Sequence, residues 1–310
     1  MAGVTNYGDI SPAVAAYAVV NMLKRGMPYL HIEKFGQTYV LPMNNTNVAK
    51  FRRYFLSGAT GSAGTGSGSF NIPTALTPLI EGVTPSGSKL ANQDYTVTLY
   101  QYGDYVTISD VVLDTHTDPI LSAATDILGE QAALTVETLR YNVLKAGTNV
   151  FYGGNVAGRA NIITAPTLAD QRRVTTGLNR QNARKISSVI SSTPDYNTKS
   201  VEAAYMAVCH PDLESDLRGI AGFKPVADYG PHTPPFEGEI GSLEQVRYLT
   251  STVIAPFADS GGTAVTNSLR FTTANTACDV YPILFFGRDA FGIVPLKGRS
   301  SMTPMVVNPK

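Results

Sequence analysis

The sequence predicts an α+β fold, in which one long helix accompanies strands that lie in other parts of the chain. Apolar residues repeat with helical spacing over residues 119–146, and no comparable pattern occurs elsewhere. Strand-like patterns occur between residues 72 and 114 and again at 201–209, 280–286 and 291–296. A single long helix without an equal partner indicates a spine that carries a sheet, rather than a helical bundle.

The long helix is predicted to begin at Asp118-Pro119, because Asp is a good N-cap and Pro is favoured at the first helical position. Gly147 is a natural stop. A helix over residues 119–146 would be about 42 Å long. We expect its buried face to consist of the apolar residues at three- and four-residue spacing, namely Leu121, Ala124, Leu128, Ala132, Leu139 and Val143.

Residues 74–113 are predicted to form a long hairpin. The first limb is 74–83, the bend lies at 84–88, and the second limb alternates through Tyr95, Val97 and Leu99. Such limbs exceed the usual strand length of about 5–6 residues, and an isolated hairpin is marginally stable in water. We therefore expect the hairpin to lie against something else.

The chain before the hairpin combines an extended segment with a glycine-rich one. Lys50-Phe51-Arg52-Arg53-Tyr54 alternates basic and aromatic residues, which is typical of a strand or an arm. Residues 57–69 are almost wholly Gly, Ser, Ala and Thr. Because they carry little apolar area to bury, we expect a flexible tether or a loop tip.

The chain after the long helix is predicted to alternate short elements with loops. Residues 168–185 indicate a second, more polar helix, and residues 211–220 indicate a short helix that begins with Pro. Residues 222–265 contain five prolines and are predicted to be rich in loops. The strands expected at 280–286 and 291–296 are joined by four residues, and we expect them to pair as a hairpin.

Composition excludes several classes of protein. The 310 residues include 24 Lys+Arg and 24 Asp+Glu, so the formal charge is zero, which argues against a dedicated nucleic-acid binder. Charged residues make up 15% of the chain, against the usual quarter or so. We infer that much of the surface is buried against other chains. Two cysteines exclude a disulfide-rich scaffold, and no apolar run reaches the roughly 18 residues that a membrane span needs.

Patterns that would indicate catalysis or metal binding are weak. Cys209-His210 is the best nucleophile–base pair, but neighbours on a strand point to opposite faces. Acids follow His31, His116 and His210 by two residues, yet no H-E-x-x-H or Cys-x-x-Cys supplies further ligands. The glycine-rich stretch lacks the Lys of a phosphate loop. The sequence therefore indicates no catalytic residue, no metal and no cofactor.

Basic residues form three clusters, each of which could bind phosphate. The alternatives are intersubunit salt bridges or a solvated helix face, and the neutral total charge favours these. The clusters are Lys50/Arg52/Arg53, Arg172/Arg173 and Arg180/Arg184/Lys185.

Several segments together resemble a known family. In chain order they are Tyr7-Gly8-Asp9-Ile10-Ser11-Pro12, Leu23-Lys24-Arg25, Glu33-Lys34-Phe35-Gly36-Gln37, Phe51-Arg52-Arg53-Tyr54, Thr77-Pro78-Leu79-Ile80-Glu81-Gly82-Val83-Thr84-Pro85, Gln101-Tyr102-Gly103-Asp104-Tyr105-Val106, Ile127-Leu128-Gly129-Glu130-Gln131-Ala132, Ala146-Gly147-Thr148-Asn149-Val150, His210-Pro211-Asp212, Gly222-Phe223-Lys224-Pro225-Val226 and Glu239-Ile240-Gly241. Spread in order over nearly the whole chain, they are similar to the major capsid proteins of tailed double-stranded-DNA bacteriophages, in the group related to the N-four-type coat protein.

The resemblance implies an HK-97-like fold with distinct regions. These would be an N-terminal arm with a Gly/Ser-rich insertion at 1–71, an extended β-hairpin loop at 72–114, a peripheral domain with the spine helix at 115–189, an axial domain at 190–279, and C-terminal strands at 280–310 that return to the peripheral domain. The family pattern continues with a further segment where this chain ends at Lys310. We therefore expect either a truncated chain or a peripheral sheet that closes differently.

The resemblance also implies the function. Subunits would assemble as pentamers and hexamers into an icosahedral shell that encloses double-stranded DNA, which is held by confinement rather than by sequence-specific contacts. The protein would be a non-enzymatic part of the virion, assembled in the host cytoplasm with scaffolding, portal and decoration proteins. Candidate intersubunit contacts are Lys50, Arg52, Arg53, Glu81, Lys89, Tyr102 and Asp104. Candidate DNA-facing or intersubunit basic residues are Arg172, Arg173, Arg180, Arg184 and Lys185.

Two other functions stay open on the sequence. An encapsulin-like compartment would use the same fold to hold protein cargo. A hydrolase would use Cys209 as nucleophile with a distant His.

Overall fold

The computed structural model describes residues 30–39, 41, 46–56, 78–84, 90–109, 120–186, 203–229, 236–263 and 277–295. Several expected features lie outside these residues, among them the Gly/Ser stretch at 57–69, Lys89 and the Asp118 N-cap. The side chain of Arg53 is likewise not described, although its backbone is.

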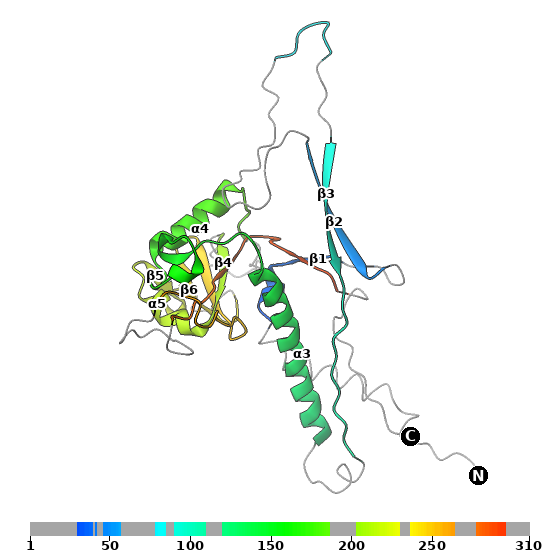
Figure 1. Ribbon diagram of the computed structural model, residues 1–310, viewed down its shortest axis with the longest axis vertical. Helices are drawn as coiled ribbons and strands as arrows, with labels where there is room; N and C mark the ends of the chain where they lie inside the picture. The colour runs from blue at the N-terminus through cyan, green and yellow to red at the C-terminus, as the bar shows by residue number, and fades with distance from the viewer. Residues whose placement is uncertain are drawn as a thin grey trace, which may run out of the picture.

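The described residues form a mixed sheet with helices, one long helix, and a two-stranded ribbon (Figure 1). The helices are α3 (Ile120–Lys145), α4 (Leu168–Arg180) and α5 (Glu214–Arg218), with 3-10 turns η3 (Ile32–Phe35), η4 (Gly153–Asn155), η5 (Arg159–Asn161), η6 (Pro211–Leu213) and η7 (Val226–Asp228). The strands are β1 (Gln37–Thr38), β2 (Val48–Leu56), β3 (Leu90–Thr98), β4 (Tyr205–Cys209), β5 (Phe223–Pro225), β6 (Glu239–Leu243), β7 (Val246–Thr250), β8 (Leu284–Phe286) and β9 (Gly292–Ile293).

The largest sheet has five strands in the order β5-β6-β7-β4-β8. Strands β4 and β7 run parallel, and the other neighbours are antiparallel. Residues 222–265, predicted to be rich in loops, also contain three strands that the prediction missed, β5, β6 and β7. Prolines at the flanks hid these short strands, while Glu244, with a φ of 49°, turns the chain tightly between β6 and β7.

Both faces of this sheet are covered by apolar packing. Alternate residues of β4 point to opposite faces, so that Tyr205 and Ala207 pack with α5 while Met206 and Val208 pack with η3 and the end of α3. The core of the described residues therefore consists of two apolar layers, one on each side of β4.

The spine helix forms as predicted, since α3 begins one residue after the expected start and ends one residue before the expected end. The expected buried face was wrong in part. Val143 is 75% exposed, whereas the side chains that the fold buries are Ala133, Glu137 and Tyr141, at four-residue spacing. Helix α3 meets the sheet near its C-terminal end, where the hydroxyl of Tyr141 donates a 2.6 Å hydrogen bond to the carbonyl oxygen of Ala255. The stripe that faces the core was therefore selected by partners distant in the chain.

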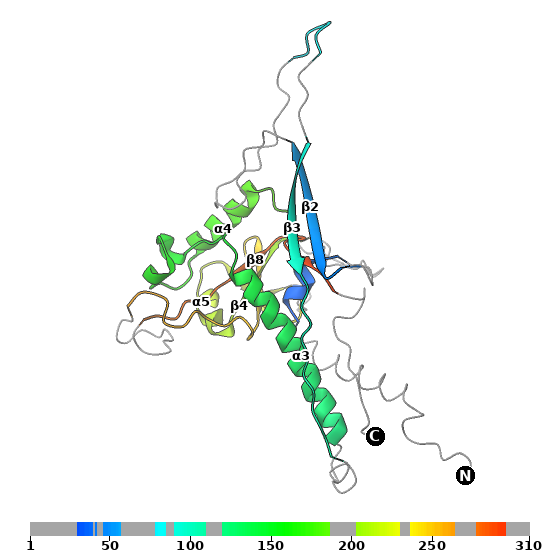
Figure 2. The same ribbon diagram turned by 45° about the vertical axis from the view of Figure 1, so that its right-hand side comes forward.

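The two-stranded ribbon differs from the predicted hairpin. Strand β3 pairs antiparallel with β2 over nine residue pairs, from Val48↔Thr98 to Leu56↔Leu90. The limb expected at 74–83 forms no strand in its described part, residues 78–84, where a turn lies at Glu81-Gly82. The partner of β3 is therefore β2, and residues 50–54, with their alternation of basic and aromatic residues, lie opposite residues 92–96. Figure 2 shows the ribbon standing apart from the sheet, with residues 78–84 at its far end.

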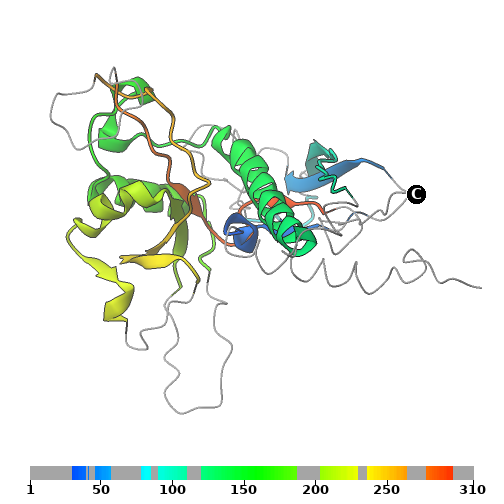
Figure 3. The ribbon, with the colours of Figure 1, turned by 90° about the horizontal axis from the view of Figure 1, so that it is seen from below.

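The C-terminal hairpin was also predicted incorrectly. Strand β8 pairs antiparallel with β4, and β9 pairs parallel with β1. The intervening turn carries the chain from one sheet to the other, and the rings of Phe286 and Phe291, 5.4 Å apart, fix this crossing in the core. Strand β9 also lies against the ribbon, because Gly292 is close to the ring of Phe51. Figure 3, seen from below, shows α3 between the sheet and the ribbon.

Helix α4 was predicted to extend to residue 185 but ends at Arg180, since Asn182 adopts a positive φ of 54°. It begins with a capping box between Thr167 and Asp170. The Gln171 amide donates a 2.7 Å hydrogen bond to the carbonyl oxygen of Leu243, which joins the helix to the sheet. Helix α4 therefore contacts the five-stranded sheet, in which β8 is an edge strand.

Candidate functional site

The described surface carries many large apolar side chains on its extended parts. They lie on the ribbon, on residues 78–84, on residues 99–109 that follow the ribbon, and on α3. Exposed apolar area of this extent is characteristic of surfaces that other protein covers. The exposed residues on these parts are Tyr54, Leu79, Ile80, Val83, Leu90, Tyr95, Val97, Tyr100, Tyr102, Tyr105, Val106, Ile127 and Val143.

The tip of the extended loop combines apolar side chains with a tight turn. The backbone N–H of Val83 donates to the carbonyl oxygen of Ile80 at 3.1 Å, and Gly82 has a φ of 77°, where glycine is favoured. Leu79 is 78% exposed. Glu81, a predicted contact residue, lies in the turn and is exposed. The turn thus presents its neighbouring apolar side chains outward.

Ion pairs hold the ribbon together at the predicted contact residues. Arg52 lies directly opposite Asp94 and donates two hydrogen bonds to its carboxylate, of 2.7 and 2.9 Å. The ammonium of Lys50 lies 3.4 Å from the same carboxylate. The hydrogen bond from Arg52 lowers the pKa of Asp94 to about 2. Two of the three predicted basic residues on β2 are therefore engaged within the ribbon itself.

Residues 99–109 run beside the outer part of α3. The Gln131 amide donates a 2.8 Å hydrogen bond to the carboxylate of Asp104, and with the backbone N–H of Tyr105 it lowers the pKa of that carboxyl. Tyr102 is exposed and available for contact. The predicted pair Tyr102 and Asp104 is thus divided, because Asp104 attaches the segment to the helix while Tyr102 faces outward.

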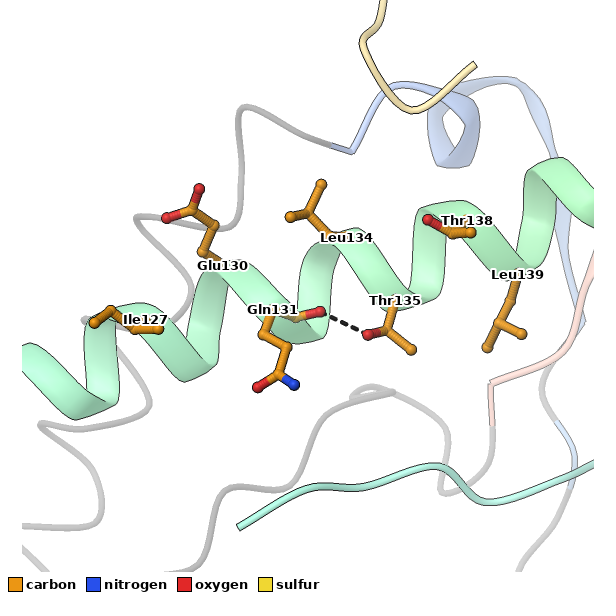
Figure 4. Close-up of a pocket in the computed structure, with 7 residues that line it drawn as sticks. All are labelled: Ile127, Glu130, Gln131, Leu134, Thr135, Thr138 and Leu139. Carbon is orange, nitrogen blue, oxygen red and sulfur yellow. Dashed lines mark hydrogen bonds between the residues drawn. The ribbon is translucent and has the colours of Figure 1, made fainter. Parts of the chain in front are cut away.

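A shallow groove of about 580 Å³ follows the outer face of α3 (Figure 4). Its sides carry Ile127, Leu134 and Leu139 between polar residues, and the Thr135 hydroxyl donates a 2.7 Å hydrogen bond to the carbonyl oxygen of Gln131. The groove is open and has no convergent set of charged groups. It suits an apolar protein segment better than a small polar ligand.

The predicted basic residues of α4 separate into two groups. Arg172 is paired with Glu244, and Arg173 lies 3.4 Å from Asp170. Arg180 is the last residue of α4, and Arg184 and Lys185 lie in the chain that follows the helix. Arg172 and Arg173 are therefore paired with acids of the same subunit.

Glu137 is a buried residue that the sequence pattern did not reveal. Its side chain is fully enclosed, and one carboxylate oxygen accepts hydrogen bonds from the backbone N–H groups of His31 (2.9 Å) and Ile32 (2.7 Å). Burial raises the pKa of this carboxyl, against the opposing effect of the two N–H groups and Arg140. In the sequence, Glu137 is visible only as a charged residue that interrupts the apolar side of a helix. Its hydrogen-bond partners, His31 and Ile32, lie far away in sequence.

Cys209 does not have the environment of a nucleophile. Its thiol is fully buried and lies 3.5 Å from the carbonyl oxygen of Leu249. Burial raises its pKa to about 12, so the reactive thiolate is scarce at neutral pH. The hydrolase hypothesis therefore has no support from this site.

The larger cavity, of about 1290 Å³, lies between α4, α5 and residues 279–286. Two of its acidic side chains make hydrogen bonds within the subunit. Asp170 accepts hydrogen bonds from Thr167 and from the backbone N–H of Gly154, and Asp212 accepts one from Tyr281 at 2.9 Å. Asp170 and Asp212 therefore take part in hydrogen bonds that join neighbouring segments around the cavity.

The part of the chain that the structure describes contains no group of three or more His, Cys, Asp or Glu side chains suited to hold a metal ion. Among its helices, none has the combined length and hydropathy for a membrane span.

Comparison with known proteins gives a consistent result. The family described as "Phage capsid protein" matches residues 93–297, which is more than half of the chain. No curated protein matches it at a significant level. Among solved structures, the capsid of Ralstonia phage GP4 is similar, with a TM-score of 0.56 and 15% identity over 84% of this chain and 73% of that one. The mature capsid of bacteriophage PhiM1 also matches, with a TM-score of 0.43 and 12% identity over 84% of this chain and 86% of that one.

These findings agree with the expected architecture. A long helix, a separate two-stranded ribbon and a mixed sheet constitute an α+β, HK-97-like capsid fold. The exposed apolar surfaces, the family match and the fold agree with a structural role. On the family match over residues 93–297, the chain belongs to the phage capsid protein family.

Proposed function

We propose that this chain is the major subunit of an icosahedral shell, assembled through hexamers and pentamers, that encloses the double-stranded DNA of a tailed phage. The observation that carries the proposal is the exposed apolar surface on the ribbon, on residues 78–84 and on α3. These parts extend away from the five-stranded sheet, and in the isolated subunit their apolar side chains face solvent.

The energetics of the ribbon support contact with neighbouring subunits. A two-stranded ribbon is marginally stable alone in water, and here its nine residue pairs carry exposed aromatic and aliphatic side chains. Burying that area against another subunit would stabilise both partners at about 25 cal/mol per Å² of apolar surface. The ion pair between Arg52 and Asp94 joins the two strands of the ribbon side by side.

The remaining parts of the proposal follow from a closed shell. Identical subunits form such a shell when the same surfaces are used around five-fold and six-fold positions. DNA inside would be held by confinement, which agrees with a chain of zero formal charge. Scaffolding, portal and decoration proteins are the expected partners, and assembly would take place in the host cytoplasm.

The test is light scattering after size-exclusion chromatography, followed by negative-stain imaging of the expressed protein. We expect capsomer rings or closed megadalton particles. A monomer of 33.1 kDa that persists when the scaffolding protein is added would contradict the proposal. Particles isolated from their native source are expected to contain nucleic acid, whereas protein cargo in its place would favour an encapsulin-like compartment.

A further inference from the structure

Four basic side chains gather where α4 ends and where the chain returns after β8. The hydroxyl of Tyr205 donates to the side-chain oxygen of Asn179 at 2.8 Å and lies 3.0 Å from the carbonyl oxygen of Ala183, which fixes the last turn of α4 on the sheet. Arg180 is the last residue of that helix. These two hydrogen bonds hold the C-terminal end of α4, and the first residues after it, against the sheet.

The other three residues are tied to the same place. The backbone N–H of Arg288 donates a 2.8 Å hydrogen bond to the carbonyl oxygen of Arg184, which joins the turn after β8 to the chain after α4. The ammonium of Lys185 lies 5.9 Å from the centroid of the Tyr205 ring. Figure 2 shows α4 and β8 in the same part of the molecule. We call Arg180, Arg184, Lys185 and Arg288 the α4-end cluster.

Most cations of the α4-end cluster have no ion pair with a described residue, unlike several other basic side chains of the subunit. Arg172 is paired with Glu244, and Arg218 with Glu214, within the subunit. In the α4-end cluster, the described residues provide one carboxylate, that of Asp289, which lies 3.5 Å from Arg288.

Among the described residues, three of the four cations of the α4-end cluster thus have no ion pair. Both Arg180 and Arg184 are exposed and have no ion pair with any described residue. In a chain with equal numbers of acids and bases, such a local excess creates a positive surface.

We propose that the α4-end cluster binds the phosphate backbone of duplex DNA without reading its sequence. Three of the four residues are Arg, whose planar guanidinium group matches the geometry of phosphate oxygens. The inference rests on the proposed function, since a shell around DNA brings one of its surfaces against phosphates at high local concentration. The proposal adds one point to DNA confinement by the shell, namely that the protein contacts DNA phosphates through the α4-end cluster.

The experiment measures how the affinity of the full-length protein for a short blunt-ended duplex depends on salt. Each phosphate contact contributes about −0.9 to the slope of log affinity against log salt concentration. Replacing all four residues of the α4-end cluster with Gln is expected to make the slope shallower by about 3. Titrations between about 50 and 200 mM salt, followed by fluorescence anisotropy, give the slope for each protein.

The matched control replaces four cations that are paired within the subunit, namely Lys50, Arg172, Arg173 and Arg218, with Gln. Its slope is expected to change by less than about 1. An equal change in both variants would show an effect of net charge alone and would overturn the proposal. An unchanged slope in the four-residue variant, together with loss of assembly, would assign the α4-end cluster to a contact between subunits and would also overturn it.

A second measurement separates this inference from the proposed function. Ultraviolet cross-linking of DNA-filled particles is expected to attach nucleotides to peptides that contain residues 180–185 or 288. If the wild-type chain forms no particles yet the slope still falls in the variant, the shell proposal fails and the phosphate site stands. If particles form and cross-links occur elsewhere, the shell proposal stands and the phosphate site fails.

Discussion

The carboxylate of Glu137 lies at the junction of α3 and the turn η3, where it accepts two backbone hydrogen bonds from a segment far away in sequence. Arg140 lies 3.7 Å from its second oxygen and 2.9 Å from Glu33, so these charges share one small region beside His31. A buried acceptor of this kind holds the start of the described chain on the spine helix. Its loss leaves two backbone N–H groups without their partner, which costs more than the bonds contribute in net terms.

Replacing Glu137 with Ala is expected to lower the free energy of unfolding by about 2–4 kcal/mol, since both N–H groups lose their acceptor in a buried site. Glu137→Gln retains an acceptor oxygen and is expected to recover most of this loss. Glu33→Gln, at a half-exposed position, is the control and is expected to change stability by less than about 1 kcal/mol. Urea denaturation of the three variants provides the comparison, and equal stability of the Ala and wild-type proteins would refute the role of Glu137.

The same residue predicts a dependence on pH. Burial raises the folded-state pKa of Glu137 above its ordinary value of 4.5, so its protonated form is the one that folding favours. Its contribution is therefore fully present below the ordinary value and decreases as the pH rises through the folded pKa. The stability of Glu137→Gln relative to the wild type should increase over that range. Melting temperatures of both proteins at several pH values test this, and a constant difference would contradict it.

Cys209 gives a prediction about reactivity. Because its thiol is enclosed and its pKa is raised to about 12, a disulfide exchange reagent at pH 8 should modify it at the rate of unfolding. Peptide mass spectrometry after a short exposure should find Cys209 unmodified in the folded protein and modified in denaturant. Rapid modification in the folded protein would restore the hydrolase hypothesis.

At the scale of single elements, α3 has two surfaces with different roles. Ala133 and Tyr141 pack into the subunit, whereas Ile127 and Val143, at different positions around and along the helix, are exposed. Helical spacing alone predicted the length of α3 correctly but placed Val143 on the buried side. Helical spacing indicates which apolar side chains are buried, but not whether the same subunit or a neighbouring one buries them. We propose that a second copy of the chain covers part of α3.

Replacing Ile127 or Val143 with Asp should therefore leave the subunit folded and impair assembly. Exposed positions change stability by about 0.5 kcal/mol or less, whereas a charge placed in an apolar contact opposes association. Asn142→Asp adds the same charge to an exposed polar position of the same helix and should assemble normally. Circular dichroism and light scattering report the two properties, and normal particles from both Ile127→Asp and Val143→Asp would rule out this contact.

At the scale of the whole molecule, the sheet with its two apolar layers is the part with a core of its own. The ribbon and residues 99–109 extend beyond it, and pairing in the ribbon ends at Thr98. Local stability follows the density of buried contacts, so the extended parts should open most readily in the isolated subunit. Assembly would then stabilise them more than it stabilises the sheet.

Hydrogen–deuterium exchange should show this difference directly. Amides of residues 100–109 are expected to exchange rapidly in the isolated subunit and slowly in particles, while those of β4 should be protected in both. The β4 strand serves as the internal reference, since all five of its residues are buried. Equal exchange of residues 100–109 in the two states would show that assembly leaves this segment uncovered.

The sequence by itself determined the features that depend on local periodicity and turn chemistry. Helix α3, the β2 strand and the burial of β4 followed from the spacing of their own side chains. The resemblance to phage capsid proteins was also present in the sequence, because its motifs are spread in order along the chain. The family match over residues 93–297 confirmed it.

The tertiary structure decided which elements meet. It paired β3 with β2, separated β8 from β9, assembled β5, β6 and β7 into the sheet, and placed Glu137 under η3. It also brought Arg288 beside Arg184, an association that no spacing in the sequence indicates. The physical reason is that strand pairing and burial depend on groups distant in the chain, whereas periodicity records only which side of each element is apolar.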